Sequence, residues 1–169
     1  ISGPDVVNPN RTSNALVNTA DIFATILELF GDANWRTRIP TTTVDSKSLM
    51  PILLNQATTV RPWEFTEIFK LAPTSGDGKA IRNTDYKLIK FDYGVQEFYN
   101  LTSDPNESHN LLDTTMTATD ISNYNYLCNE MLNLTGSGAS CKNFPSGINN
   151  EIKISNQFTI EPNPAQNQL

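Results

Sequence analysis

Residues 78–112 read GKAIRNTDYKLIKFDYGVQEFYNLTSDPNESHNLL, and this stretch decides the fold class of the chain. Apolar and polar residues alternate there in three runs, 80–82, 86–93 and 96–101, a pattern typical of strands. Residues that favour turns (Asn, Asp and Gly) separate the runs. Asp104-Pro105-Asn106 predicts a further turn, because Pro fixes φ and Asn tolerates left-handed geometry. The stretch therefore predicts a compact antiparallel unit.

Four further elements are expected outside this stretch. They are a helix over residues 20–30 capped by Asn18 or Thr19, a short helix over 46–54 whose continuity Pro51 disturbs, and a strand over 61–69. The last is a helix that begins at Thr117 or Thr119 and ends at Leu134, with Thr119 as the expected N-cap and Gly136 past its end. A half-buried antiparallel sheet needs an apolar cover. The predicted fold class is therefore α+β: a small antiparallel sheet of about four strands with a packing C-terminal helix, preceded by a helix with a wide apolar face.

The motifs of this stretch resemble a known family. The matching positions are Ala80-Ile81-Arg82, Tyr86-Lys87-Leu88-Ile89, Glu97-Phe98-Tyr99-Asn100-Leu101, Asp104-Pro105, Glu107 and Asn110-Leu111. In this order and spacing they resemble the C-terminal subdomain of arylsulfatase-like sulfatases, within the alkaline phosphatase superfamily. Two upstream blocks extend the resemblance: residues 16–29, with Ala24 in place of the usual Pro, and residues 45–53, with Ser46 in place of Gly.

The resemblance implies a division of the chain and a partner for its first helix. Residues 1–58 would end the α/β catalytic domain of the sulfatase fold and residues 59–141 would form the C-terminal subdomain. Residues 142–169 would be a linker followed by a truncated sorting domain, which a separate resemblance at the end of the chain implies. In the family the helix over 20–30 packs on the large catalytic sheet. We therefore expect its apolar face to bind the N-terminal catalytic portion of the same protein, or a second copy of this chain.

The resemblance also implies a chemistry whose main residues lie elsewhere. Sulfatases use a Cys or Ser in a Cys/Ser-x-Pro-x-Arg motif, oxidised to formylglycine, and bind Ca²⁺ through aspartates and asparagine. Neither Cys128 nor Cys141 lies in such a motif, the metal ligands would precede Ile1, and the chain has no initiator Met. We therefore expect the C-terminal portion of a secreted sulfatase acting on a sulfated substrate such as a polysaccharide. The chain itself would have no catalytic residue, metal ligand or cofactor, and would be inactive alone.

Two other interpretations of the chain stay open. One is a metal-dependent phosphodiesterase or phosphatase of the same superfamily, and the other is a non-catalytic binding or structural module. The sequence upstream of Ile1 would discriminate between them, because a Cys/Ser-x-Pro-x-Arg motif indicates a sulfatase, whereas a Thr or unmodified Ser nucleophile indicates a phosphate-ester enzyme.

The end of the chain carries a second resemblance. Residues 158–169, FTIEPNPAQNQL, are similar to the start of the C-terminal sorting domain of Bacteroidetes type IX secretion cargo, which implies a secreted or cell-surface protein. The net charge of -6 and the absence of a Lys/Arg run argue against nucleic acid as a partner. The longest apolar run, residues 49–54, is too short for a transmembrane segment.

A disulfide is predicted between Cys128 and Cys141. Cys128 lies in an expected helix, and the Gly/Ser-rich stretch between the cysteines can return Cys141 to it. Two free thiols are the alternative, whereas zinc is disfavoured because His109 is the one histidine in the sequence and lies far from both cysteines. A persistent disulfide indicates an oxidising compartment.

Arg82 is the candidate substrate-binding residue, because a guanidinium group suits sulfate oxygens. The alternative that we favour is a structural pair with a carboxylate. The other polar candidates receive structural interpretations: His109 as a solvated loop residue, Asp104 as part of an Asx turn rather than a calcium ligand with Glu107, and Lys79, Lys87 and Lys90 as residues on solvated strand faces.

Overall fold

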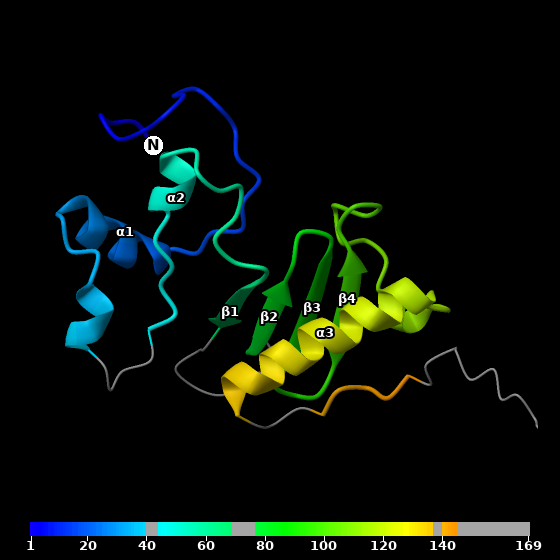
Figure 1. Cartoon of the computed structure of the whole chain (residues 1–169). Helices are drawn as coiled ribbons and strands as arrows, with labels where there is room; N and C mark the ends of the chain where they lie inside the picture. The colour runs from blue at the N-terminus through cyan, green and yellow to red at the C-terminus, as the bar shows by residue number, and fades with distance from the viewer. Residues whose placement is uncertain (40–43, 69–76, 137–139, 145–169) are drawn as a thin grey trace, which may run out of the picture.

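The computed structural model describes residues 1–39, 44–68, 77–136 and 140–144 (Figure 1). Its centre is an antiparallel sheet with the strand order β1-β2-β3-β4. The strands are β1 (Glu64–Ile68), β2 (Gly78–Arg82), β3 (Tyr86–Phe91) and β4 (Gln96–Asn100). The predicted four-stranded antiparallel sheet is confirmed. The strand expected over 61–69 begins only at Glu64, because Pro62 cannot donate to a strand ladder and Arg61 pairs with another part of the chain.

The residues of β3 alternate between the two faces of the sheet. Tyr86, Leu88 and Lys90 are buried on one face, whereas the residues between them are half-buried on the other. The register places Leu88 between Ile81 of β2 and Phe98 of β4, and all three side chains are fully buried. Strands β2, β3 and β4 therefore present one continuous apolar surface.

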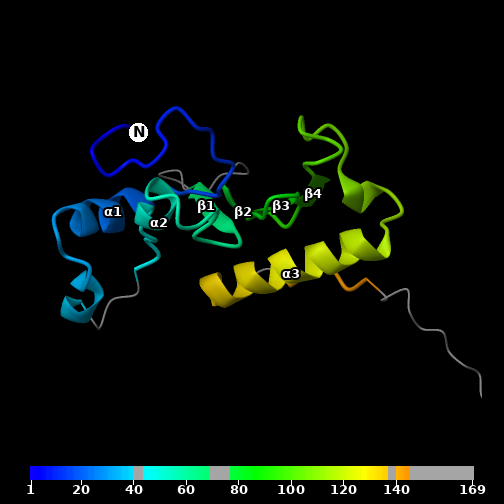
Figure 2. The same cartoon turned by 45° about the horizontal axis from the view of Figure 1, so that its top comes forward.

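Helix α3 (Ala118–Thr135) covers this apolar surface. It contributes Tyr124, Leu127, Cys128 and Met131 to the core. Figure 2 shows the sheet nearly edge-on, with α3 lying along one face. Each large side chain buried in this layer contributes about 1.5–3 kcal/mol relative to exposure, so the helix and the sheet depend on one another.

The ends of α3 follow from local hydrogen bonds. Thr117 is the N-cap, and it forms a capping box in which its hydroxyl accepts from the Asp120 amide while the Asp120 carboxylate accepts from Thr117. Thr119, expected as N-cap, instead lies inside the helix, because only Thr117 has the partner three residues later that completes the box. Gly136 ends the helix at φ 73°, as predicted.

A smaller helical unit precedes the sheet. It comprises α1 (Asp21–Leu29), the 3₁₀ helix η1 (Trp35–Arg38) and α2 (Met50–Leu53). The expected N-cap, Asn18 or Thr19, is wrong: the N-cap of α1 is Ala20, which forms no side-chain cap. Asn18 supports the turn before the helix, because its side-chain oxygen accepts from the Ala20 amide at 3.0 Å. The short helix begins at Met50 rather than at residue 46, because Pro51 lies in its first turn. Proline is favoured there, so Pro51 helps to start this helix and does not disturb it.

A buried ion pair joins the helical unit to the segment that leads into β1. The Asp21 carboxylate, which is fully buried, accepts from the Arg61 guanidinium and from the Lys47 amide. Asn18 donates to the carbonyl of Phe65 in β1 at 3.2 Å. Removing one partner of a buried ion pair leaves an uncompensated charge, at a cost of about 3–5 kcal/mol. These contacts therefore hold α1 in a fixed position beside β1.

Ser46 and Ala24 contact one another. They are the two positions in the upstream blocks at which this chain differs from the usual residues of the sulfatase family. The Ser46 hydroxyl donates to the Ala20 carbonyl at 2.6 Å and accepts from the Ala24 amide at 3.0 Å. Ser46 and Ala24 are both buried. The serine therefore bridges the carbonyl and amide of the first helical turn of α1, an amide that proline at position 24 would lack.

Candidate functional site

The face of the sheet opposite α3 contains a hollow of about 420 Å³. No helix of the described residues covers this face, as the edge-on view in Figure 2 shows. The lining comes from three adjacent strands and includes Glu64, Thr66, Ile68, Ala80, Arg82, Lys87, Ile89 and Phe91. We call this surface the open face. Its floor is apolar and its charged side chains gather where Glu64, Arg82 and Lys87 lie side by side in register.

Arg82 lies at the centre of this charged row. Its Nε donates to the carbonyl of Asn83 at 3.3 Å. Glu64 is directly opposite it on β1 and Lys87 is directly opposite it on β3. Within the described residues, Arg82 forms no ion pair with a carboxylate. The structural pair expected for Arg82 is thus not present in this part of the chain.

Lys87 is held by an acidic residue of the loop that follows β4. Its Nζ lies 2.7 Å and 2.8 Å from the two carboxylate oxygens of Glu107. Glu107 has φ 55°, a left-handed conformation that non-glycine residues adopt infrequently. Lys87 is therefore half-buried and paired, and its interpretation as a freely solvated residue is wrong.

Lys90 and Lys79 also differ from that expectation. Lys90 is only 4% exposed, because it lies on the face that α3 covers, and burial lowers the pKa of its amino group. Lys79 is half-buried and lies 3.3 Å from Asp92. The alternation of β3 places Lys90 with Tyr86 and Leu88, so the periodicity of the sequence was a better guide than the residue type.

The loop after β4 is organised around Asp104. Its carboxylate accepts from the amide of His109, five residues ahead, at 2.8 Å, so it closes a wider loop than an Asx turn. Backbone hydrogen bonds from Ser108 and His109 lower the pKa of Asp104. The His109 side chain is 83% exposed, which confirms it as a solvated loop residue.

The described residues do not fit a calcium site. Asp104 is engaged by backbone amides and Glu107 by Lys87, so neither carboxylate is available. No group of three or more His, Cys, Asp and Glu side chains in the described part of the chain is placed to hold a metal ion. None of its helices is long and apolar enough to cross a membrane.

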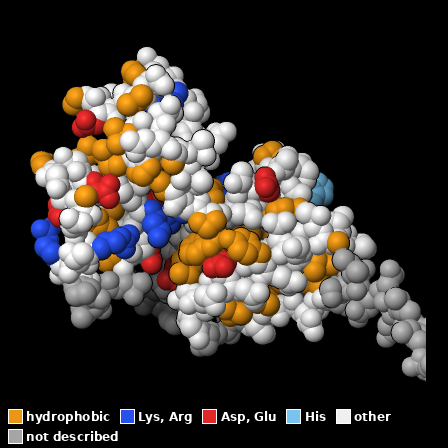
Figure 3. Space-filling view, viewed as in Figure 1, with side chains coloured by type: hydrophobic (Ala, Val, Ile, Leu, Met, Phe, Trp, Pro, Cys, Tyr) orange, Lys and Arg blue, Asp and Glu red, His pale blue; other side chains and the backbone are white. Residues whose placement is uncertain are grey.

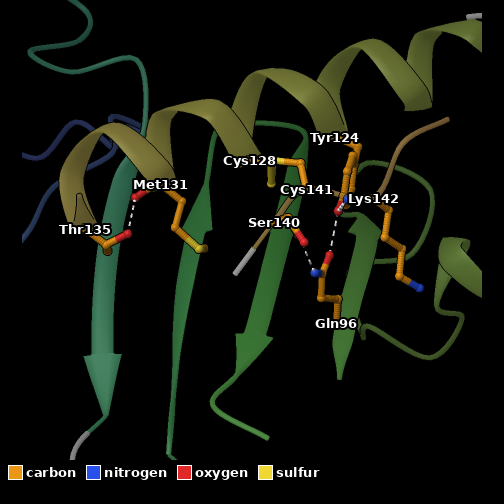
Figure 4. Close-up of a disulfide and its surroundings, with 8 residues drawn as sticks. All are labelled: Gln96, Tyr124, Cys128, Met131, Thr135, Ser140, Cys141 and Lys142. Atoms are coloured by element: carbon orange, nitrogen blue, oxygen red, sulfur yellow. Dashed lines mark hydrogen bonds between the residues drawn. A yellow bond between two sulfur atoms is a disulfide. The ribbon is translucent and has the colours of Figure 1, made fainter. Parts of the chain in front are cut away.

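The predicted disulfide between Cys128 and Cys141 is present, with the two Cα atoms 5.9 Å apart. Figure 4 shows that residues 140–142 return beside α3 and contact the start of β4 at Gln96. The Tyr124 hydroxyl donates to Gln96 at 2.5 Å and accepts from the Lys142 amide at 2.8 Å. Gln96 in turn donates to the carbonyl of Ser140 at 3.3 Å. We call residues 140–144 the strap.

The strap also adds to the core. The rings of Phe144 and Tyr124 meet edge to face, with centroids 5.0 Å apart. Burial raises the pKa of the Tyr124 phenol, so this hydroxyl stays neutral and serves as both donor and acceptor. The sequence indicated the cysteine pairing but not this network, because its members are 18 and 28 residues apart.

A second uncovered surface lies on α1. Ile22, Phe23, Ile26 and Leu29 are between 45% and 53% exposed and Phe30 is 86% exposed. In Figure 3 hydrophobic side chains are visible over the helical unit and gather over the sheet beside α3. The expected apolar face of this helix is therefore left without sufficient cover by the described residues. Such a row of large apolar residues is typical of an interaction surface.

The predicted site residues do not converge. Arg82 lies on the open face, Cys128 and Cys141 lie beneath α3 on the other side of the sheet, and His109 lies in the loop after β4. The sequence analysis did not single out Glu64 as a neighbour of Arg82, nor the pairing of Lys87 with Glu107. An antiparallel pairing of residues 64–68 with residues 78–82 would have placed Glu64 directly opposite Arg82.

Comparisons with known proteins agree with this architecture. The family model described as "N-sulphoglucosamine sulphohydrolase, C-terminal" matches residues 1–134. Among solved structures, BT1596, a 2-O GAG sulfatase, is similar with a TM-score of 0.65 at 20% identity, over 80% of this chain and 29% of that chain. BT4656, solved in complex with its substrate D-glucosamine-2-N,6-O-disulfate, is similar with a TM-score of 0.52 at 23% identity, over 68% of this chain and 23% of that chain. A structure of yidJ from Bacteroides fragilis is similar with a TM-score of 0.59 at 19% identity, over 80% of this chain and 29% of that chain.

No curated protein matches the chain. The fold and the family match together define its class as the C-terminal part of a sulfatase. More specifically, the chain belongs to the N-sulphoglucosamine sulphohydrolase C-terminal family, because the family model matches residues 1–134 of the chain's 169. The chain spans less than a third of the length of these solved structures, because each match covers 29% or less of the other protein's chain.

Proposed function

We propose that this chain is the C-terminal portion of a secreted sulfatase whose longer N-terminal part supplies the formylglycine nucleophile and the calcium ligands. The family match carries the proposal, since it spans both the helical unit and the sheet. The buried Asp21–Arg61 pair supports it physically, because it joins α1 to the segment that leads into β1. In this proposal the chain closes the fold and hydrolyses no ester by itself.

The N-terminal catalytic portion is the proposed cover for the apolar face of α1. Five large side chains of this helix are about half exposed or more. Burying a large apolar side chain contributes about 1.5–3 kcal/mol, so covering this row is a strong driving force for association. In the absence of that portion, the isolated chain is expected to use the same face for self-association.

The proposed substrate of the whole enzyme is a sulfated polysaccharide. The printed descriptions of two similar structures support this class, one being a 2-O GAG sulfatase and the other a complex with D-glucosamine-2-N,6-O-disulfate. The proposed location is extracellular or on the cell surface. The Cys128–Cys141 disulfide supports it, since such bonds persist in oxidising compartments. The proposed type IX sorting signal falls within 142–169, of which residues 145–169 lie outside the described part of the chain.

The test compares chain 1–169 with the full-length gene product, using an aryl sulfate as substrate in the presence of calcium. We expect turnover by the full-length protein, loss of turnover when the Cys or Ser of its Cys/Ser-x-Pro-x-Arg motif is replaced by Ala, and no turnover by chain 1–169. Metal-dependent hydrolysis by chain 1–169, or a full-length protein that cleaves phosphate esters instead, would contradict the proposal.

A further inference from the structure

The open face combines an apolar floor with a guanidinium group that has few acceptors among the described residues. Its floor consists of half-buried Ala80, Ile89 and Phe91 and of Ile68, which is 57% exposed. Above this floor the Arg82 guanidinium forms one hydrogen bond, through Nε, within the described residues. A guanidinium group carries five N–H donors, so most of the donors of Arg82 have no protein acceptor in this part of the chain.

The apolar floor favours a protein segment over a sulfated sugar as the occupant. Lys87 is already neutralised by Glu107, and Glu64 adds a negative charge directly beside Arg82. A sulfate subsite would need several converging cations, whereas Arg82 is the one cation lining this face that forms no ion pair within the described residues. A packed protein element would instead bury the floor and provide one carboxylate to Arg82.

We propose that the open face is a second docking surface for the N-terminal part of the same protein, and that a carboxylate of that part forms a bidentate ion pair with Arg82. The proposal rests on the proposed function, because it requires the longer protein. The length of chain outside this structure supports this occupant, since the solved relatives are more than three times as long as the part that they share with it. The α1 face is thus one of two contacts rather than the whole interface.

The register of the sheet defines how the carboxylate approaches. Glu64 lies on one side of Arg82 and Lys87 on the other. The repulsion from Glu64 and the attraction from Lys87 both direct an incoming carboxylate to the β3 side of Arg82. Ile89, on the same face of β3, then lies beneath the incoming chain and provides its apolar contact.

The experiment measures urea midpoints of the full-length protein and of chain 1–169, each with Arg82→Gln, Arg82→Lys, Glu64→Gln and the exposed control Lys142→Gln. We expect Arg82→Gln to lower the midpoint of the full-length protein and to leave that of chain 1–169 unchanged. Arg82→Lys should give a partial loss, because Lys keeps the charge but not the bidentate geometry. Glu64→Gln should maintain or raise the full-length midpoint, and Lys142→Gln should change neither protein.

Kinetics with a sulfated disaccharide separate the remaining outcomes. A raised KM of Arg82→Gln with an unchanged midpoint would assign Arg82 to the substrate and overturn the docking proposal. An equal loss of urea midpoint in the full-length protein and in chain 1–169 would assign Arg82 a role within this chain and would also overturn the docking proposal. If the wild-type full-length protein is an active sulfatase and Arg82→Gln is neutral, this inference fails while the proposed function stands.

Discussion

The hydroxyl of Ser46 satisfies a buried amide of α1, and its removal has a predictable cost. Ser46→Ala removes the bond to the Ala24 amide, which is fully buried and has no access to water. The Ala20 carbonyl is less affected, because it also accepts from the Phe23 amide and Ala20 is exposed. An unsatisfied buried donor costs about 1–3 kcal/mol, so we expect a loss of that size in the free energy of unfolding.

A double-mutant cycle combines Ser46→Ala with Ala24→Pro. The second substitution introduces the proline that is usual at this position in the sulfatase family. In the Ser46 protein it should be destabilising, because the proline ring carbon occupies the space between the Ala24 nitrogen and the Ser46 hydroxyl, which are 3.0 Å apart. In the Ser46→Ala protein it should recover most of the loss, because proline removes the stranded N–H. The coupling energy between the two positions should therefore be favourable by about 1–3 kcal/mol.

The assay is urea unfolding followed by tryptophan fluorescence, which comes from Trp35 and Trp63. Trp35 is 3% exposed and meets the Phe23 ring of α1 edge to face, so its emission should change when the helical unit unfolds. Amide exchange at Ala24 provides a local measurement and should accelerate in Ser46→Ala. The reasoning is refuted if Ser46→Ala costs less than about 0.5 kcal/mol, the scale of an ordinary surface substitution, or if Ala24→Pro has the same effect in both backgrounds.

Three further predictions concern other parts of the chain. Replacing Cys128 and Cys141 by Ser should lower the free energy of unfolding by about 3 kcal/mol, the loop-closure value, and alkylation with mass spectrometry should detect no free thiol in the oxidised wild type. Burial and Asp120 raise the pKa of Tyr86 to about 12 from an ordinary 10.0, so stability should fall as pH rises above 10 and the unfolded chain ionises first. Tyr86→Phe should flatten this slope in alkaline denaturation curves, and an unchanged slope would show that Tyr86 does not cause it. Phe23→Ser with Ile26→Ser should reduce self-association of chain 1–169 in sedimentation experiments, whereas equal association would place the contact elsewhere.

The sheet could be predicted because its information is local. Alternation and turn residues are read within a few positions, and the alternation of β3 puts Lys90 on the same face as Tyr86 and Leu88. The error about Lys90 came from its charge, since a lysine buried beneath a helix is infrequent. Pro51 was misread for a similar reason, because proline interrupts a helix only beyond its first turn.

The side-chain contacts between distant segments could not be predicted in the same way. The Ser46–Ala24 bridge, the Asp21–Arg61 pair and the Gln96–Tyr124 bond join residues 22 to 40 positions apart. No periodicity encodes such pairs, because they depend on the relative placement of whole elements. The disulfide was the exception, since two cysteines in an otherwise cysteine-free chain have one pairing available within it.

The strap determines how a pulling force would enter the folded core. Tension applied beyond Phe144 passes through Cys141 into Cys128, near the middle of α3. The remaining residues of α3, about two turns, lie outside this path and cannot be peeled from the sheet one turn at a time. The helix must instead slide from the sheet as a unit, which breaks its apolar contacts together rather than in sequence. Reduction of the disulfide changes this response from shear to peeling while the contacts of the core stay the same.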